Sequence, residues 1–112
     1  MKILRLTRHK IESGQLAELQ RLYGADCEVL EVSETVPNAA RVSEIVREQC
    51  ADVLEAVLPL PLMAEVVGPR GCGIPVIRAI TRREFAEDGV KVHFTFSHYE
   101  KVLKVEVVTE RL

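Results

Sequence analysis

The stretch Ala51-Asp-Val-Leu-Glu-Ala-Val-Leu58 is the most apolar strand candidate in the chain, and Pro59 ends it. A near-continuous apolar run bounded by proline is typical of a strand that is buried on both faces, as the central strands of parallel sheets are. Glu55 is an unusual residue in such a strand. We expect its carboxylate to face a helix end, to pair with an arginine or to lie at a dimer contact.

Strand-like and helix-like segments alternate on both sides of this stretch. Three further apolar segments have strand character: residues 2–7, 27–32 and 74–80. Apolar residues recur at helical spacing in the intervening segments: residues 13–23, 38–50 and 62–67. Ser13 and Asn38 are good helix caps, and Gly24 stands where the first helix should end. The alternation predicts an α/β fold, a Rossmann-like open sheet that is mostly parallel, with four βα-type strands.

The last quarter of the chain predicts a different strand arrangement. Residues 90–96 alternate apolar and polar side chains, which is typical of an antiparallel strand with one wet face. Residues 102–108 form a second β-rich stretch, and His98 and Tyr99 lie between the two, at the expected bend. We therefore expect a C-terminal antiparallel β-hairpin beside the parallel sheet, within a single domain over residues 1–112.

The overall composition is that of an ordinary globular domain. Apolar residues make up 47% of the 112 residues, and 15 basic against 17 acidic side chains give a net charge of −2. This balance argues against a duplex-DNA binder with a wide basic face. No apolar run approaches the roughly 18 residues of a membrane span, so no membrane partner is expected, and residues 1–4 lead directly into a strand pattern rather than a signal peptide.

Cysteines and histidines point to no metal or cofactor. Cys27, Cys50 and Cys72 are widely spaced without a CxxC pair, which favours three small core residues in a reduced, cytoplasmic protein. The three histidines are isolated, and no HExxH motif or carboxylate cluster accompanies them. We therefore expect neither a metal site nor a bound cofactor.

The candidate ligand site lies at the carboxyl ends of the strands. Ligands of open α/β sheets bind there, at the point where the strand order reverses, and the first strand borders that point in both common strand orders. Thr7, Arg8 and His9 follow that strand. Residues after the third and fourth strands should emerge on the same edge: Pro59, Leu60, Pro61, Thr81, Arg82 and Arg83.

This rim is locally basic although the chain is acidic. Four of the ten arginines fall within one 14-residue stretch: Arg70, Arg78, Arg82 and Arg83. Because arginine offers phosphate a bidentate fork, the clustering favours an anionic, phosphorylated ligand. Alternatively, Arg8-His9-Lys10 is a solvated loop and Arg82-Arg83 pair with Glu84 and Glu87. The loop Gly68–Gly73 lacks the GxGxxG and Walker patterns, so a plain connection is favoured over a phosphate cradle.

Three segments together resemble a known family. They are Leu6-Thr-Arg-His9, Leu58-Pro-Leu-Pro-Leu-Met-Ala-Glu65 and Ile74-Pro-Val-Ile-Arg-Ala-Ile-Thr-Arg-Arg83. They resemble the small stand-alone CRISPR-associated proteins related to CARF (CRISPR-associated Rossmann fold) domains, whose members include ring nucleases. The resemblance covers about residues 2–83, and the His-Tyr-Glu-Lys stretch near residue 100 extends it.

The resemblance implies a homodimer that takes part in type III CRISPR antiviral defence. Such a dimer would bind cyclic oligoadenylate, above all cyclic tetra-adenylate, across its twofold axis and cleave it slowly without metal, through attack by a 2′-hydroxyl. Arg8 and His9 would be catalytic, with Thr7 beside them in the ligand site. Pro59 and Leu60 would lie beneath an adenine. The expected phosphate contacts are Thr81, Arg82 and Arg83.

Three other functions are compatible with the same residues. A sensor or sponge would bind the ring and leave it intact. A different nucleotide-binding or phosphometabolite enzyme could occupy a flavodoxin-like sheet, because a fold alone does not define a function. A structural or interaction protein would instead use its exposed hairpin as a partner surface.

Overall fold

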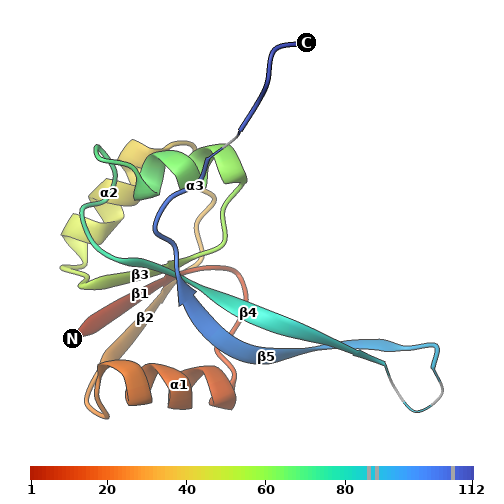
Figure 1. The fold of residues 1–112 in the computed structure, drawn as a ribbon. Helices are drawn as coiled ribbons and strands as arrows, with labels where there is room; N and C mark the ends of the chain where they lie inside the picture. The colour runs from red at the N-terminus through yellow and green to blue at the C-terminus, as the bar shows by residue number, and fades with distance from the viewer. Residues whose placement is uncertain (86, 88, 107) are drawn as a thin grey trace.

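A computed structural model describes residues 1–85, 87, 89–106 and 108–112. Five strands form one sheet in the order β2-β1-β3-β4-β5 (Figure 1). Their bounds are Lys2–Leu6 (β1), Glu28–Val32 (β2), Val53–Ala56 (β3), Val76–Phe85 (β4) and Val92–Lys101 (β5). The first four strands are parallel, and β5 pairs antiparallel to β4. The α/β class and the mostly parallel, Rossmann-like open sheet are confirmed.

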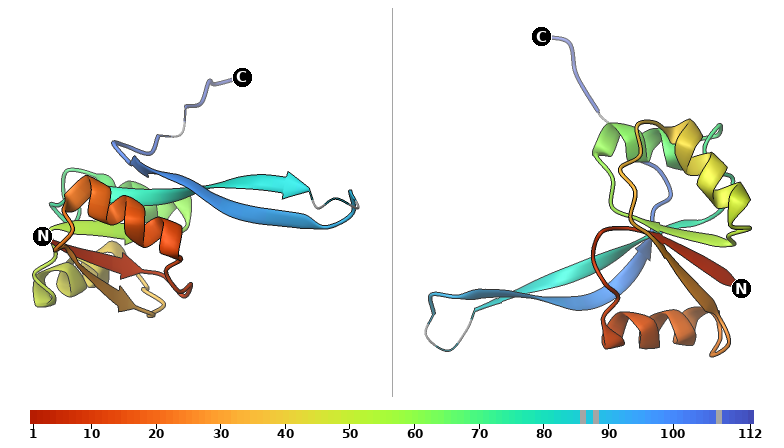
Figure 2. Two further views of the ribbon diagram at one scale, coloured as in Figure 1. Left: turned by 90° about the horizontal axis from the view of Figure 1, so that it is seen from below. Right: turned by 180° about the vertical axis from the view of Figure 1, so that it is seen from behind.

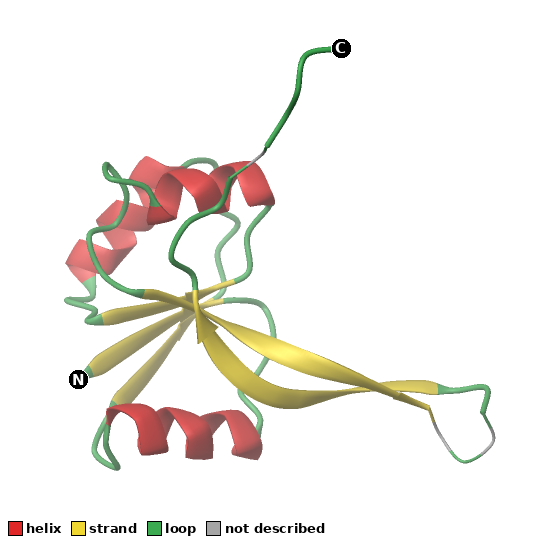
Figure 3. Ribbon diagram, viewed as in Figure 1, coloured by secondary structure: helices red, strands yellow, loops and turns green. Residues whose placement is uncertain are grey.

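Three helices cover the two faces of the parallel part of the sheet. α1 (Ser13–Tyr23) lies on one face, while α2 (Ala39–Glu48) and α3 (Leu60–Val67) lie on the other (Figures 1 and 3). Within the described residues, no helix is long and apolar enough to cross a membrane. Each connection between consecutive parallel strands contains one of these helices, which packs on a face of the sheet. Parallel strands require such crossover connections.

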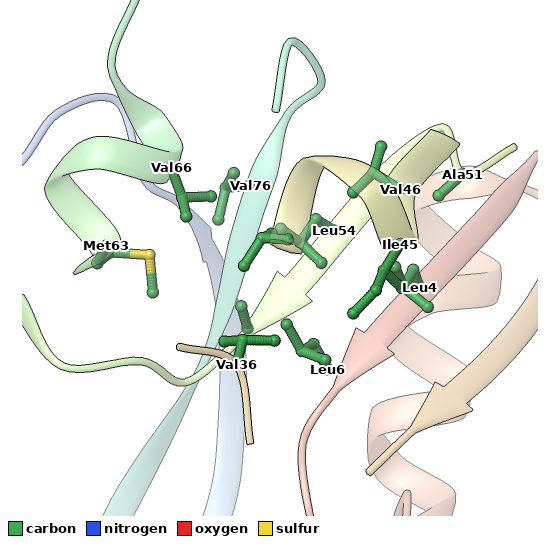
Figure 4. Packing of buried hydrophobic residues seen from close by; sticks show 12 residues of the cluster. Leu4, Leu6, Val36, Ile45, Val46, Ala51, Leu54, Met63, Val66 and Val76 are labelled. Atoms are coloured by element: carbon green, nitrogen blue, oxygen red, sulfur yellow. The ribbon is translucent and has the colours of Figure 1, made fainter. Parts of the chain in front are cut away.

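The larger core cluster lies between the sheet and the pair α2 and α3. Leu4, Leu54 and Val76 point toward these helices from neighbouring strands and are almost fully buried (Figure 4). The smaller cluster lies under α1, where Leu19 packs against alternate residues of the same strands: Ile3, Val53 and Ile77. Because both faces are covered, all four residues of β3 are buried, as the apolar run from residue 51 predicts.

Local capping determines where two of the helices begin and end. The Asn38 side chain accepts a hydrogen bond from the Arg41 N–H at 2.9 Å, so the predicted cap of α2 is confirmed. The N-cap of α1 is Glu12 rather than Ser13. The Glu12 N–H donates a hydrogen bond to the Gln15 side chain at 2.9 Å. Gly24 ends α1 with φ of 105°, a conformation that glycine adopts without a steric penalty.

The hairpin is built from other residues than the sequence predicts. β4 and β5 themselves form it, and none of the described residues in 102–108 belongs to a strand. His98 and Tyr99, expected at a bend, lie inside β5. A β-bulge at Ser97 explains the error, because the extra residue changes the phase of the apolar alternation along the strand. Residue 107 is outside the described part of the chain.

The β4–β5 ribbon, residues 79–85 and 92–99, projects beyond the rest of the sheet (Figure 2). Glu55, one residue before the end of β3, pairs with Ile77. Residues 79–85 therefore continue past the carboxyl edge of the parallel strands, for about 23 Å at the usual rise of a strand. This is the edge at which ligands of such sheets bind.

The cysteine prediction is correct at two positions and wrong at the third. Cys27 and Cys72 are half-buried and pack against the two core clusters. Cys50 is exposed and has φ of 52°, because α2 ends at Glu48 and the chain turns away from the apolar stripe of the helix.

Candidate ligand-binding cleft

A cleft of about 510 Å³ opens at the carboxyl ends of β1, β2 and β3. The strand order reverses at β1, whose neighbours are β2 on one side and β3 on the other. The cleft thus occupies the position at which ligands of doubly wound sheets bind. Three loops contribute its walls, at residues 6–9, 34–37 and 57–62, with Leu60 excepted.

The two sides of the cleft differ in chemistry. Arg8, His9 and Thr35 lie on the side formed by the loops after β1 and β2, and the Arg8 guanidinium donates a hydrogen bond to the Thr35 hydroxyl. The loop after β3 contributes apolar side chains, among them Leu58 and Pro59. Since Arg8 and His9 are exposed, a ligand can reach both. The arrangement suits a molecule with a flat apolar ring and an anionic group.

Two hydrogen bonds hold the backbone of His9, in the loop that also carries Arg8. The His9 N–H donates to the Thr7 hydroxyl at 3.2 Å, and the His9 carbonyl accepts from Nη1 of Arg5 at 3.2 Å. Arg5 itself is 1% exposed. A buried side chain of β1 therefore holds the backbone at the mouth of the cleft.

Arg5 belongs to a buried polar network under α1. Its Nε and Nη2 donate to the two oxygens of Glu55 at 3.1 and 3.3 Å, and Nη1 donates to Glu31 at 2.7 Å. The Tyr99 hydroxyl donates to Glu55 at 2.7 Å. Of the three surroundings expected for Glu55, the arginine pair is confirmed. The network joins β1, β2, β3 and β5 in one layer.

Electrostatics in this network follow from burial and pairing. Burial opposes the positive charge of Arg5, but the hydrogen bonds and charges of Glu55 and Glu31 outweigh it and raise the pKa of Arg5. Burial raises the pKa of Tyr99, and its hydrogen bond to the Glu55 carboxylate raises this pKa further. Tyr99 therefore stays a proton donor in the folded chain well above neutral pH.

Glu34 and Thr35 line the cleft although the sequence did not single them out. Glu34 is paired with Nε and Nη2 of Arg41 at 2.7 and 2.8 Å, and this pair lowers the pKa of the Glu34 carboxyl. Both residues follow β2, and a strand that pairs in parallel with β1 must end at the same edge. Their position after a predicted parallel strand was the pattern that could have identified them.

The structure gathers some of the predicted site residues and separates others. Thr7, Arg8, His9 and Pro59 meet in the cleft. Leu60 lines a separate apolar cavity of about 230 Å³, beside Met63 and Ile80.

Thr81, Arg82 and Arg83 do not line this cleft. The predicted strand end at Ile80 is wrong, because β4 continues through all three residues and they extend along the ribbon. Ladder pairing with β5 keeps them in strand conformation, and the guanidinium of Arg83 lies 5.5 Å from the centre of the Phe85 ring.

The loop from Gly68 to Gly73 connects α3 to β4, and it closes against the end of α3. The Cys72 N–H donates to the Val66 carbonyl at 3.0 Å, and a Cβ on Gly71 would lie 1.8 Å from the same oxygen. Only glycine fits this position. A helix carboxyl end repels anions, so this loop is suited to a connection rather than to a phosphate.

Comparisons with known proteins add no relatives to this description. No protein-family model, no curated protein and no solved structure matches the chain. Among the described residues, no three His, Cys, Asp or Glu side chains gather in the way that a metal ion would need.

Proposed function

We propose that the cleft binds cyclic oligoadenylate and that the protein is a ring nuclease. One observation carries this proposal: Arg8 and His9 both line a cleft with an apolar floor. The cleft lies where the strand order of the sheet reverses. An adenine would lie against Leu58 and Pro59, and an adjoining phosphate would lie beside Arg8. The resemblance of the sequence to the CARF-related proteins supplies the class of ligand.

The chemistry requires little from the protein. A ribose 2′-hydroxyl attacks the neighbouring phosphorus, the bond to the 5′-oxygen breaks, and a 2′,3′-cyclic phosphate forms. Arg8 would stabilise the charge that develops on the phosphate oxygens, and His9 would act as the general acid or base that transfers the proton. A cyclic tetra-adenylate has four phosphates and a twofold shape, so one ring would span the clefts of two copies.

The direct test mixes the protein with cyclic tri-, tetra- and hexa-adenylate in EDTA and identifies the products by mass spectrometry. Linear oligoadenylates ending in a 2′,3′-cyclic phosphate are expected. Arg8→Ala and His9→Ala should each lower the rate at least about tenfold, on the scale of one general acid or base. Lys10→Ala is the matched control, since Lys10 is exposed beside them and does not line the cleft. Unchanged rates in both variants would remove Arg8 and His9 from the mechanism.

One observation favours a sensor or sponge as the second candidate. Glu34 is paired with Arg41, which leaves His9 as the one unpaired side chain of the described cleft lining that belongs to a general acid–base type. A cleft with a single proton-transfer group can bind the ring and leave it uncleaved. Intact rings together with tight binding in calorimetry would support this function. Absence of binding to every ring would contradict both candidates and favour another nucleotide or phosphometabolite enzyme.

A further inference from the structure

One face of the β4–β5 ribbon carries four apolar side chains: Phe85, Val92, Phe94 and Phe96. The strand register places Arg83 opposite Phe94 and Phe85 opposite Val92. Alternate residues share a face, which therefore consists of Thr81, Arg83, Phe85, Val92, Phe94 and Phe96. All three phenylalanines of the chain lie on this face. The opposite face is polar and carries Arg82, Glu84, His93 and Thr95.

Within the described residues, the chain covers this apolar face at its root, where the ribbon leaves the sheet. The Phe96 ring lies 5.0 Å from the Tyr99 ring, and Gly14 of α1 approaches it. Beyond α1, no helix formed by the described residues lies on either side of the ribbon (Figures 1 and 2). Phe85 and Phe94 are accordingly 64% and 66% exposed. A two-stranded ribbon is marginally stable in water by itself. A partner that packs on Phe85 and Phe94 would therefore stabilise this one.

The molecule exposes enough surplus surface for a stable interface. Its accessible surface is 7983 Å². A compact monomer of its 12.6 kDa exposes roughly 6,200 Å², so the surplus is about 1,800 Å². The radius of gyration is 15.7 Å, against roughly 13 Å for a compact domain of this length. The ribbon and the extended C-terminal residues share this surplus (Figure 1), and a stable interface requires about 800 Å² per partner.

The charges in the sequence from the end of β4 to the start of β5 favour a protein partner that carries both signs. Residues 81–91 contain three basic and three acidic side chains. A membrane surface or a nucleic acid would call for an excess of basic residues. A second copy of the same ribbon has the same apolar face and the same mixture of charges. It can therefore cover the apolar side chains and place acidic side chains opposite basic ones.

We propose that the apolar face of the β4–β5 ribbon is a homodimer interface. Two copies pack this face against each other about a twofold axis, with Phe85 and Phe94 at its centre. The ribbon leaves the sheet at the carboxyl edge, so the partner copy is held at the edge that contains the cleft. The proposal deepens the proposed function by naming the surface that joins the two copies. Its test involves no nucleotide, so a failure of this interface is distinguished from a failure of ring binding or cleavage.

The first test compares the mass in solution of three proteins by light scattering over a range of concentrations. The double variant Phe85→Ser with Phe94→Ser changes the apolar face. The double variant Glu84→Ser with His93→Ser is the matched control, since these residues pair with each other on the polar face. We expect two copies for the wild type and for the control, and one copy for the phenylalanine variant with an unchanged circular dichroism spectrum. A monomeric wild type, or a phenylalanine variant that stays dimeric, would overturn the proposal.

A second test needs no substitution and therefore does not depend on the folding of a variant. Amide hydrogen exchange of β4 and β5 is measured in the wild-type chain at high and low protein concentration. Dilution should accelerate exchange at the ribbon, while β1 and β3 keep their protection. Exchange at the ribbon that does not depend on concentration would contradict a homodimer on this face.

Discussion

The two ends of β4 lie in opposite environments. Val76 and Ile77 are 2% and 3% exposed, while Phe85, the largest apolar side chain of the strand, is 64% exposed. The first end lies between β3 and β5 with helices on both faces, and the second extends beyond all three helices. Burial in this strand therefore follows helix coverage rather than side-chain hydrophobicity. The two regions should respond differently to substitution.

The largest effect is expected inside the sheet, at the buried pair of Arg5 and Glu55. Glu55→Ala leaves the Arg5 guanidinium buried beside Glu31 alone. Removing one member of a buried ion pair costs about 3 to 5 kcal/mol. Urea unfolding followed by circular dichroism measures this loss. The double variant Arg5→Met with Glu55→Leu is the control, and it should recover most of the stability because no charge stays unpaired. A double variant as unstable as Glu55→Ala would show that packing rather than charge dominates.

Truncation of the core should come next. Leu54→Ala removes a fully buried side chain between β1 and β4, and such changes cost about 2 to 5 kcal/mol. Phe94→Ala removes a larger side chain from the ribbon, where it touches little of its own chain. In dilute protein, thermal unfolding should shift strongly for Leu54→Ala and little for Phe94→Ala. Equal shifts would contradict the contrast between the two regions.

Tyr99 joins the two regions, and its removal should have an intermediate effect. Tyr99→Phe loses the hydrogen bond to the Glu55 carboxylate, a kind worth about 1.5 to 3 kcal/mol. The raised pKa means that the folded chain keeps this proton above pH 10.0, where an unfolded tyrosine loses it. The contribution is therefore complete below pH 10.0 and is lost as the pH rises toward the folded pKa. Urea titrations at rising pH should show a smaller decline in Tyr99→Phe than in the wild type.

Absorbance at 295 nm reports this ionisation directly. Tyr23 is the matched residue, because burial alone raises its pKa. Tyr99→Phe and Tyr23→Phe each leave a single tyrosine. The tyrosine that remains in Tyr23→Phe should ionise at the higher pH. The reverse order would mean that the bond between Tyr99 and Glu55 does not persist in solution.

The smallest effect is expected at the exposed pair of Arg78 and Glu100. The two side chains lie 3.3 Å apart across β4 and β5 and are about half exposed. Exposed pairs contribute little because water screens them. Arg78→Ala should leave the urea midpoint unchanged within error. A clear loss of stability would indicate that this part of the sheet is less open to solvent than its exposure suggests.

Hydrophobic patterning was sufficient to predict the parallel half of the fold. The runs that became β1, β2 and β3 are apolar because helices cover them, and Asn38 and Gly24 mark helix boundaries through their own local chemistry. The hydrophobic pattern in the sequence of the ribbon is weaker than that of the parallel strands. Thr81-Arg-Arg-Glu84 reads as a loop, since a strand that no helix covers needs no apolar residues on its exposed face.

The candidate site was predictable where it depends on a single strand end. Thr7, Arg8 and His9 follow β1, and β1 borders the reversal point in either common strand order. Glu34 and Thr35 follow a predicted parallel strand, but they reach the cleft because β2 lies beside β1, and the local sequence does not encode that neighbour. The displacement of Arg82 and Arg83 depends on the length of β4, which pairing with β5 extends.

The buried network also has a consequence for the order of folding. Arg5 finds its partners 26 and 50 residues away along the chain, and Glu55 lies 44 residues from Tyr99. Contacts between such distant segments form only after the intervening loops have closed. β1, β2 and β3 must therefore be assembled before Arg5 forms its ion pairs with Glu31 and Glu55. β5 must pack beside them before the Tyr99 hydroxyl can donate to Glu55. The hydrogen bonds that complete this network thus depend on contacts between distant segments, and Arg5 at its centre also holds the His9 backbone at the cleft.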